Sequence, residues 1–103
     1  MLPIDKFIAN IENEKFVKAH EVLEESWKEL KKKDKEEANL QKGLINGATA
    51  IALKIKGKEK GAYMVWKTYL KYKPLVNSVT SNLSKKYKIA EKLLDEKYQK
   101  YMI

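Results

Sequence analysis

Residues 34–57, DKEEANLQKGLINGATAIALKIKG, decide the fold of this chain. Apolar side chains recur at helical spacing on most sides of this stretch, at Leu40, Leu44, Ile45, Ala48, Ile51, Ala52 and Ile55. A helix that is apolar around most of its circumference must be covered by other helices. Asp34 is a typical N-cap residue and Gly57 a typical stop. The stretch therefore predicts a central helix that begins after Asp34 and ends around Gly57.

Amphipathic helices are also predicted on both sides of this central element. Pro3 suits a first helical turn, and the apolar spacing predicts a short helix from there to Ile11 and a second helix from Phe16 to near Lys33. After Gly57, the pattern predicts a fourth helix that closes before Pro74. A last helix is predicted over residues 87–101, whereas residues 75–84 are typical of a loop or an irregular short helix. We expect an all-α, single-domain bundle of about five helices over residues 1–103.

Three small residues, Gly43, Gly47 and Ala50, form a strip on the central helix. Glycine lowers helix propensity, but a strip without large side chains lets another helix approach closely. The strip predicts a helix crossing at this point.

Composition limits the class of protein. A chain of 103 residues with 44% hydrophobic residues can bury one modest core without a disulfide or a metal. The absence of cysteine removes thiolate catalysis and zinc-thiolate sites, and it fits a reducing compartment. No apolar run approaches the ~20 residues that cross a bilayer, and the N-terminus does not resemble a signal peptide. We therefore expect a cytoplasmic protein with no membrane contact.

The formal net charge of +8 comes from lysine alone, because the chain has no arginine. Lysine is a hydrated point charge that lacks the planar fork with which arginine reads guanine, so specific base recognition is disfavoured. A surface rich in lysine and glutamate is also common in hyperthermophile proteins, which explains the charge without a ligand. Non-specific nucleic-acid binding remains an alternative, through Lys54, Lys56, Lys58, Lys60, Lys67 and Lys71, with Tyr63, Tyr69 and Tyr72 as stacking groups.

The only histidine of the chain lies in the stretch AHEVLEESW, residues 19–27. Residues four apart are neighbours on a helix, so His20 and Glu24 can share a hydrogen bond, and Trp27 follows on the same stripe. On the central helix, Lys42, Asn46 and Thr49 form a polar strip. If this strip faces the stripe of His20, a polar pocket lies between the second and third helices.

Several kinds of chemistry find no support in the sequence. The serines lie outside any nucleophile elbow, and no glycine-rich phosphate loop follows a strand. A helical di-iron site needs two Glu-x-x-His motifs and a zinc protease needs His-Glu-x-x-His, but Glu24 stands where the second histidine would fall. We expect no cofactor and no metal site within one chain.

The chain resembles a known family in three spaced motifs. The motifs are Phe16-x-x-Ala19-His20-Glu21-Val22-Leu23-Glu24-Glu25-x-Trp27, Gly43-Leu44-Ile45-Asn46-x-Ala48 and Gly57-x-x-x-Gly61-Ala62. In this order, they resemble the small helical family called domain of unknown function 309. The resemblance implies a compact all-α bundle and assigns no biochemical role. The chain departs from the usual pattern in having Asn46 where glutamine is typical, Gly47 where a larger apolar residue is common, and no arginine near Trp27.

Three functions stay open at this point. The first is a small binding or interaction module, expected to self-associate, that uses Glu21, Trp27, Lys42 and Asn46 with His20 and Glu24 to hold a small polar ligand. The second is a hydrolase-like or lyase-like enzyme in which His20 is the general base and Glu24 orients it. The third is the nucleic-acid alternative given above. A purely structural role for His20, with its ring nitrogens satisfied by neighbouring groups, competes with the first two. An accessible His20 in contact with Glu24 would keep the enzyme alternative, and full burial would end it.

Overall fold

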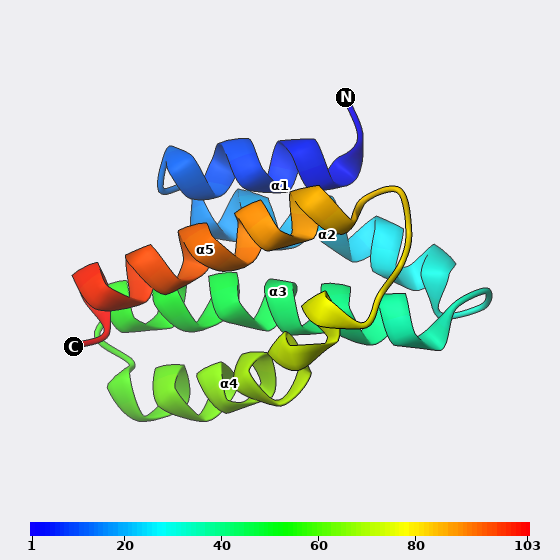
Figure 1. Ribbon diagram of the computed structural model, residues 1–103. Coiled ribbons are helices and arrows are strands. Elements are labelled where there is room, and N and C mark those ends of the chain that lie inside the picture. The colour runs from blue at the N-terminus through cyan, green and yellow to red at the C-terminus, as the bar shows by residue number, and fades with distance from the viewer.

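The computed structural model describes residues 1–103 as five α-helices and one short 3-10 helix, without β-strands. The elements are α1 (Pro3–Glu12), α2 (Phe16–Leu30), α3 (Lys35–Ile55), α4 (Glu59–Tyr72), η1 (Lys73–Asn77) and α5 (Ser84–Tyr101). Figure 1 shows α3 through the middle of the bundle, with α1 and α2 on one side and α4 on the other. The all-α bundle predicted from the sequence is confirmed.

The central position of α3 follows from its apolar surface. It contacts α2, α4 and α5, and eleven of its residues are buried, which confirms the predicted central helix. The predicted ends are confirmed as well. The side chain of Asp34 accepts a hydrogen bond from the backbone N–H of Glu37 at 3.1 Å, which caps the first turn. Gly57 has a φ of +83°, in the left-handed region that glycine adopts without strain.

The other helices place one apolar face each against α3 or against one another. α1 packs on α2 and α5, so it closes the side of the bundle opposite α4. The core combines aliphatic side chains with aromatic residues from four helices, including Phe7, Phe16, Tyr69 and Tyr87. None of the helices is both long enough and apolar enough to span a lipid bilayer.

The segment that the sequence left open is an irregular connection. α4 ends at Tyr72 and η1 begins with Lys73 and Pro74, because proline cannot donate the backbone hydrogen bond that would continue the α-helix. Val76 and Val79 bury their side chains and hold the connection on the core. The chain then turns at Ser81, and the hydroxyl of Ser84 donates to the carbonyl of Ser81 at 2.8 Å where α5 begins.

The predicted close helix approach on the small-residue strip is confirmed, and it involves two helices. A Cβ atom added at Gly43 would lie 2.9 Å from Cβ of Tyr72 on α4. A Cβ atom added at Gly47 would lie 2.9 Å from Cδ1 of Leu94 on α5 and 3.2 Å from the ring of Tyr69 on α4. Side chains of α4 and α5 thus occupy the space beside the two glycines of α3.

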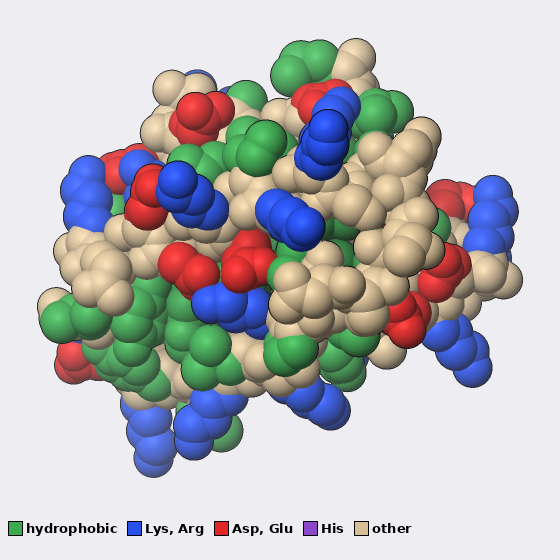
Figure 2. Space-filling model, viewed as in Figure 1, with side chains coloured by type: hydrophobic (Ala, Val, Ile, Leu, Met, Phe, Trp, Pro, Cys, Tyr) green, Lys and Arg blue, Asp and Glu red, His purple; other side chains and the backbone are tan.

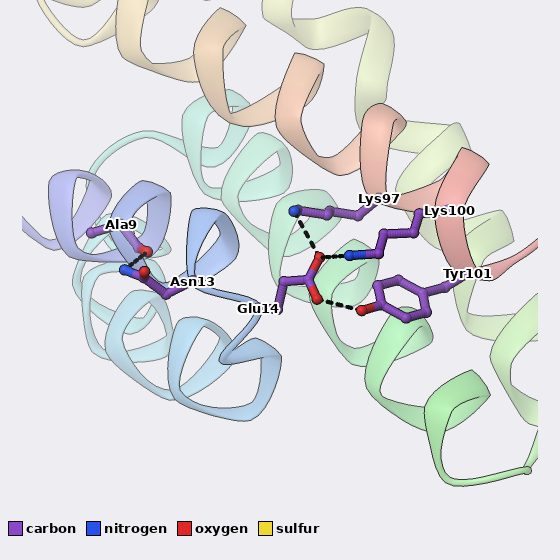
Figure 3. A network of polar contacts seen from close by, with 6 residues as sticks. All are labelled: Ala9, Asn13, Glu14, Lys97, Lys100 and Tyr101. Carbon is purple, nitrogen blue, oxygen red and sulfur yellow. Dashed lines mark hydrogen bonds and ion pairs between the residues drawn. The ribbon is translucent and has the colours of Figure 1, made fainter.

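Glu14 joins the turn between α1 and α2 to the end of α5. Figure 3 shows its carboxylate pointing toward Lys97, Lys100 and Tyr101. Oε2 accepts hydrogen bonds from the ammonium groups of Lys97 at 2.8 Å and Lys100 at 2.7 Å, and Oε1 accepts one from the hydroxyl of Tyr101. Hydrogen bonds from Lys100, Lys97 and Tyr101 lower the pKa of Glu14 to about 2. The contacts tie the turn between α1 and α2 to the last turns of α5, and they form although Glu14 has a positive φ of 59°.

We expect this network to make part of the stability pH-dependent. A carboxylate whose pKa is lower in the folded chain stabilises the fold at pH values above its ordinary pKa. That stability is lost as the pH falls from 4.5 to about 2, where the folded group takes up its proton. Urea unfolding over this pH range should therefore show that the free energy of unfolding falls more steeply in the wild type than in Glu14→Gln. Glu12→Gln, at an exposed glutamate in no ion pair, is the control and should follow the wild type. Parallel curves for the wild type and Glu14→Gln would contradict this role.

Candidate functional site

The antiparallel packing of α2 on α3 brings the two predicted polar stripes together. A groove of about 280 Å³ lies between the helices. Its lining consists of three residues from α2 and four from α3: His20, Glu24, Trp27, Lys42, Ile45, Asn46 and Thr49. The polar strip of α3 therefore faces the stripe of His20, and a groove lies between them, as expected for that arrangement. Ile45 contributes an apolar wall that the polar pattern did not include.

The side chains of His20 and Glu24 contact each other on the wall of the groove. Nε2 of His20 lies 3.0 Å from Oε2 of Glu24, and the two side chains are 34% and 37% exposed. Lys28 approaches the other carboxylate oxygen at 3.9 Å. The carboxylate orients the imidazole ring, which solvent and small molecules can reach. This is the condition that keeps an acid–base role open.

The polar side chains of α3 are partly engaged by their own helix. The amide of Asn46 donates to the carbonyl of Lys42 at 2.7 Å, and the hydroxyl of Thr49 donates to the carbonyl of Ile45 at 3.0 Å. Such bonds fix the side chains and leave their oxygen atoms to accept further hydrogen bonds. The α3 wall therefore offers acceptors from Asn46 and Thr49 and a mobile donor from Lys42.

Trp27 lies at the end of the α2 wall nearest the turn to α3 and is half-buried. The ammonium group of Lys31 lies 4.3 Å from the centre of its ring, a cation–π contact. Glu21, which the sequence analysis had included among the ligand-binding residues, is exposed and does not line the groove. On a helix, a residue next to His20 in the sequence points about 100° away from it, so Glu21 cannot share its face.

A second depression continues the groove past Trp27. It measures about 230 Å³, lies toward the turn between α2 and α3, and shares Trp27 and Lys42 with the first. Its other lining residues are Lys31, Lys35, Ala38 and Asn39. This part of the groove was not predicted from the sequence. Its residues lie on the same faces of α2 and α3 as the residues of the first groove. Extending the stripe of His20 and the strip of Lys42 toward the turn would therefore have predicted it.

A buried polar cluster lies on another face of α3, against α5. The hydroxyl of Tyr87 donates to Glu37 and accepts a hydrogen bond from the amide of Gln41 at 2.9 Å. Burial, and then the hydrogen bond to Glu37, raise the pKa of this hydroxyl. Glu37 is 6% exposed and Gln41 1% exposed, so the cluster has little access to solvent. The signal for it in the sequence is the pair Glu37 and Gln41, at i and i+4 on a mostly apolar helix. Neither residue lines a groove or cavity.

Some of the residues proposed for nucleic-acid binding are not available for it in the structure. Tyr69 is 1% exposed and its hydroxyl donates to Asp95 at 2.9 Å, so its ring is not available for stacking on bases. The hydroxyl of Tyr63 donates to the backbone carbonyl of Met102, and Lys54 pairs with Glu59. On the face shown in Figure 2, basic side chains are spread over several elements with acidic side chains between them. This distribution does not form one basic stripe on that face.

Comparison with known proteins adds a family and no activity. No curated protein and no solved structure matches the chain. The family model described as "Domain of unknown function (DUF309)" matches residues 4–65. This range contains α1 from Ile4 onward, all of α2 and α3, and every residue that lines the groove. The resemblance seen in the sequence motifs is thereby confirmed, and the chain belongs to the DUF309 family.

Proposed function

We propose that this protein is a small binding module whose groove between α2 and α3 holds a small polar ligand. The observation that carries the proposal is the convergence of an accessible His20–Glu24 pair, the indole of Trp27 and the polar strip of α3 on one groove of about 280 Å³. Pockets for small molecules combine an apolar wall with a few polar groups that fix orientation. Here Trp27 and Ile45 supply the wall.

The His20–Glu24 contact is not needed to hold the helices together. Both side chains belong to α2, so their contact joins no two elements. Exposed pairs at i and i+4 stabilise a helix by only about 0.3–0.5 kcal/mol. A role in ligand binding accounts better for a lone histidine that faces a groove.

The enzyme alternative is supported by the same geometry. Because Glu24 contacts Nε2, the ring is oriented with its other nitrogen free to take a proton from a substrate. Lys42, on the opposite wall, could stabilise negative charge that develops on that substrate. This reading needs a reacting group that the chain does not identify, so it stands second to binding.

Location and assembly belong to the proposal as well. The cysteine-free composition supports a cytoplasmic setting. Half-exposed apolar side chains, such as Val17 and Ile55, support self-association.

His20→Gln tests the proposal because we expect it to change function and leave stability nearly intact. The free energy of unfolding should change by less than about 0.5 kcal/mol, since the lost contact is exposed. A library of small polar metabolites would be screened by NMR against the wild type, His20→Gln and Lys92→Gln, a control at an exposed lysine of α5. We expect hits that shift the signals of His20, Trp27 and Asn46, and at least about tenfold weaker binding by His20→Gln alone, as for a lost charge-assisted hydrogen bond.

Two results would contradict this proposal. Hits whose signals lie outside the groove, or hits that bind His20→Gln as well as the wild type, would remove His20 from the site. A loss of stability above about 1 kcal/mol in His20→Gln would indicate that the histidine holds the fold through a buried hydrogen bond.

A further inference from the structure

The second depression differs in charge from the first. Three of its six lining residues are lysines, namely Lys31, Lys35 and Lys42, and none of its lining residues is acidic. The only acid along the whole groove is Glu24, which already contacts His20 and Lys28. The groove therefore has a cationic end near the turn between α2 and α3, and an end near His20 that carries its only carboxylate.

These three lysines are also unpaired. Lys54, Lys73, Lys86, Lys97 and Lys100 all form ion pairs with acidic side chains. Lys31, Lys35 and Lys42 form no ion pair, as is true of most lysines of the chain, and the ammonium groups of Lys31 and Lys42 lie 4.3 Å and 6.0 Å from the ring centres of Trp27 and Tyr72. Like charges around one depression repel one another, and an anion bound among them would relieve that repulsion. The positive charge at this end is thus free for a ligand.

We propose that the ligand of the groove is the phosphate monoester of a small polar molecule. The phosphate lies among Lys31, Lys35 and Lys42, and the polar remainder extends over Trp27 toward His20 and Asn46. A phosphate monoester carries about −1.5 to −2 charges at neutral pH, which suits three ammonium groups better than a single carboxylate does. The amide of Asn39 adds a neutral donor on the same wall. This inference rests on the proposed function and names the class of its ligand.

Trp27 provides a direct signal for such binding. The ammonium group of Lys31 lies 4.3 Å from the ring centre, and a phosphate among the lysines would draw it away from the indole. The other tryptophan, Trp66, is buried and stacks on Tyr98 at 4.7 Å. Trp66→Phe would leave Trp27 as the only fluorescent indole, with circular dichroism to verify that this variant folds; if it does not, the indole N–H signal of Trp27 in the wild type serves instead.

The experiment compares four small probes with one nucleic acid at constant ionic strength: ribose 5-phosphate, inorganic phosphate, ribose and acetate, and a single-stranded oligothymidylate. We expect ribose 5-phosphate to bind most tightly, inorganic phosphate more weakly at the same place, and ribose and acetate at least about tenfold more weakly than ribose 5-phosphate. Lys35→Gln and Lys42→Gln should each weaken binding of ribose 5-phosphate about five- to tenfold. Lys85→Gln and Lys92→Gln, which remove one charge from exposed, unpaired lysines of α5, should change it less than twofold.

The outcomes separate this inference from the proposed function. If ribose binds, shifts the NMR signals of His20 and binds the lysine variants as tightly as the wild type, the phosphate inference is overturned and the proposed binding module stands. Phosphate binding with no shift at His20 in any complex would support the lysine site and contradict the proposed use of His20. Equal loss in all four lysine variants would show an effect of net charge alone and overturn the inference. Acetate binding as tight as that of inorganic phosphate, or a single-stranded oligothymidylate far tighter than ribose 5-phosphate, would also overturn it.

Discussion

Tyr87→Phe should lower the free energy of unfolding by about 3 kcal/mol, although it removes a single oxygen atom. That oxygen donates to the carboxylate of Glu37 and accepts from the amide of Gln41 at 2.9 Å, all in the interior between α3 and α5. A hydrogen bond to a charged group contributes about 1.5–3 kcal/mol, and a buried donor left unpaired costs about 1–3 kcal/mol. Urea unfolding followed by circular dichroism would measure the change.

The loss of stability is expected to be large because no other group in the cluster can replace the hydrogen bonds of the Tyr87 hydroxyl. Oε1 of Gln41 is already buried without a hydrogen bond. The hydroxyl of Tyr87 is the only group that the structure places in hydrogen-bond contact with the carboxylate of Glu37 or with the amide nitrogen of Gln41. Without that hydroxyl, the remaining polar groups are left desolvated and unpaired, which low-dielectric surroundings make costly.

Two further variants test this explanation. Tyr98→Phe is the control, because the ring of Tyr98 stacks on Trp66 and its hydroxyl forms no hydrogen bond, so we expect a change below about 0.5 kcal/mol. In the triple variant Glu37→Met, Gln41→Met and Tyr87→Phe, all three polar groups are replaced by apolar ones, and most of the lost stability should return. A Tyr87→Phe variant as stable as Tyr98→Phe would show that the cluster is hydrated and contributes little.

The helices of this fold could be predicted from the sequence because their signals are local. The span of α3 follows from the apolar pattern between Asp34 and Gly57, where a capping side chain and a left-handed glycine act within one turn of the helix. The connection after Pro74 could not be derived in the same way. Val76 and Val79 are held by burial in the core, and their local pattern contains no signal for the 3-10 turn.

The candidate site was predictable only in part, for the same reason. The contact of His20 with Glu24 follows from helical spacing, and its placement opposite Asn46 required only that α2 and α3 pack as neighbours. The contact of Tyr87 with Glu37 joins residues 50 positions apart, and it depends on how α5 crosses α3. The small-residue strip predicts a close helix approach on α3, but it identifies neither the partner helix nor the position of Tyr87 against Glu37, so the buried cluster became visible only in the folded chain.

Gly43→Ala should lower the free energy of unfolding by about 2 kcal/mol, whereas the same change at Gly61 should raise it by about 0.5 kcal/mol. Both glycines lie in helices, where alanine is intrinsically favoured by roughly 0.5–1 kcal/mol. At Gly43, however, the new Cβ would lie 2.9 Å from Cβ of Tyr72 and 3.7 Å from the backbone oxygen of Tyr69. At Gly61 its nearest neighbour would be Cδ1 of Leu53 at 3.9 Å, an ordinary contact. Thermal and urea unfolding of the two variants would measure the difference.

Gly47→Ala separates the crowding from the loss of glycine as such. Its new Cβ would meet Cδ1 of Leu94 at 2.9 Å and the ring of Tyr69 at 3.2 Å. The leucine atom is the end of a flexible side chain, which can turn away for about 0.5–1.5 kcal/mol, and the ring has to shift by only a fraction of an ångström. At Gly43 the obstacle is the root of Tyr72, which moves only if α4 itself moves away from α3. We therefore expect Gly43→Ala to be the least stable of the three variants, Gly47→Ala to lie near the wild type and Gly61→Ala to be the most stable. Equal stability of the Gly43 and Gly47 variants would mean that α4 yields as readily as one leucine side chain, and that the close approach of these helices does not fix the position of α4.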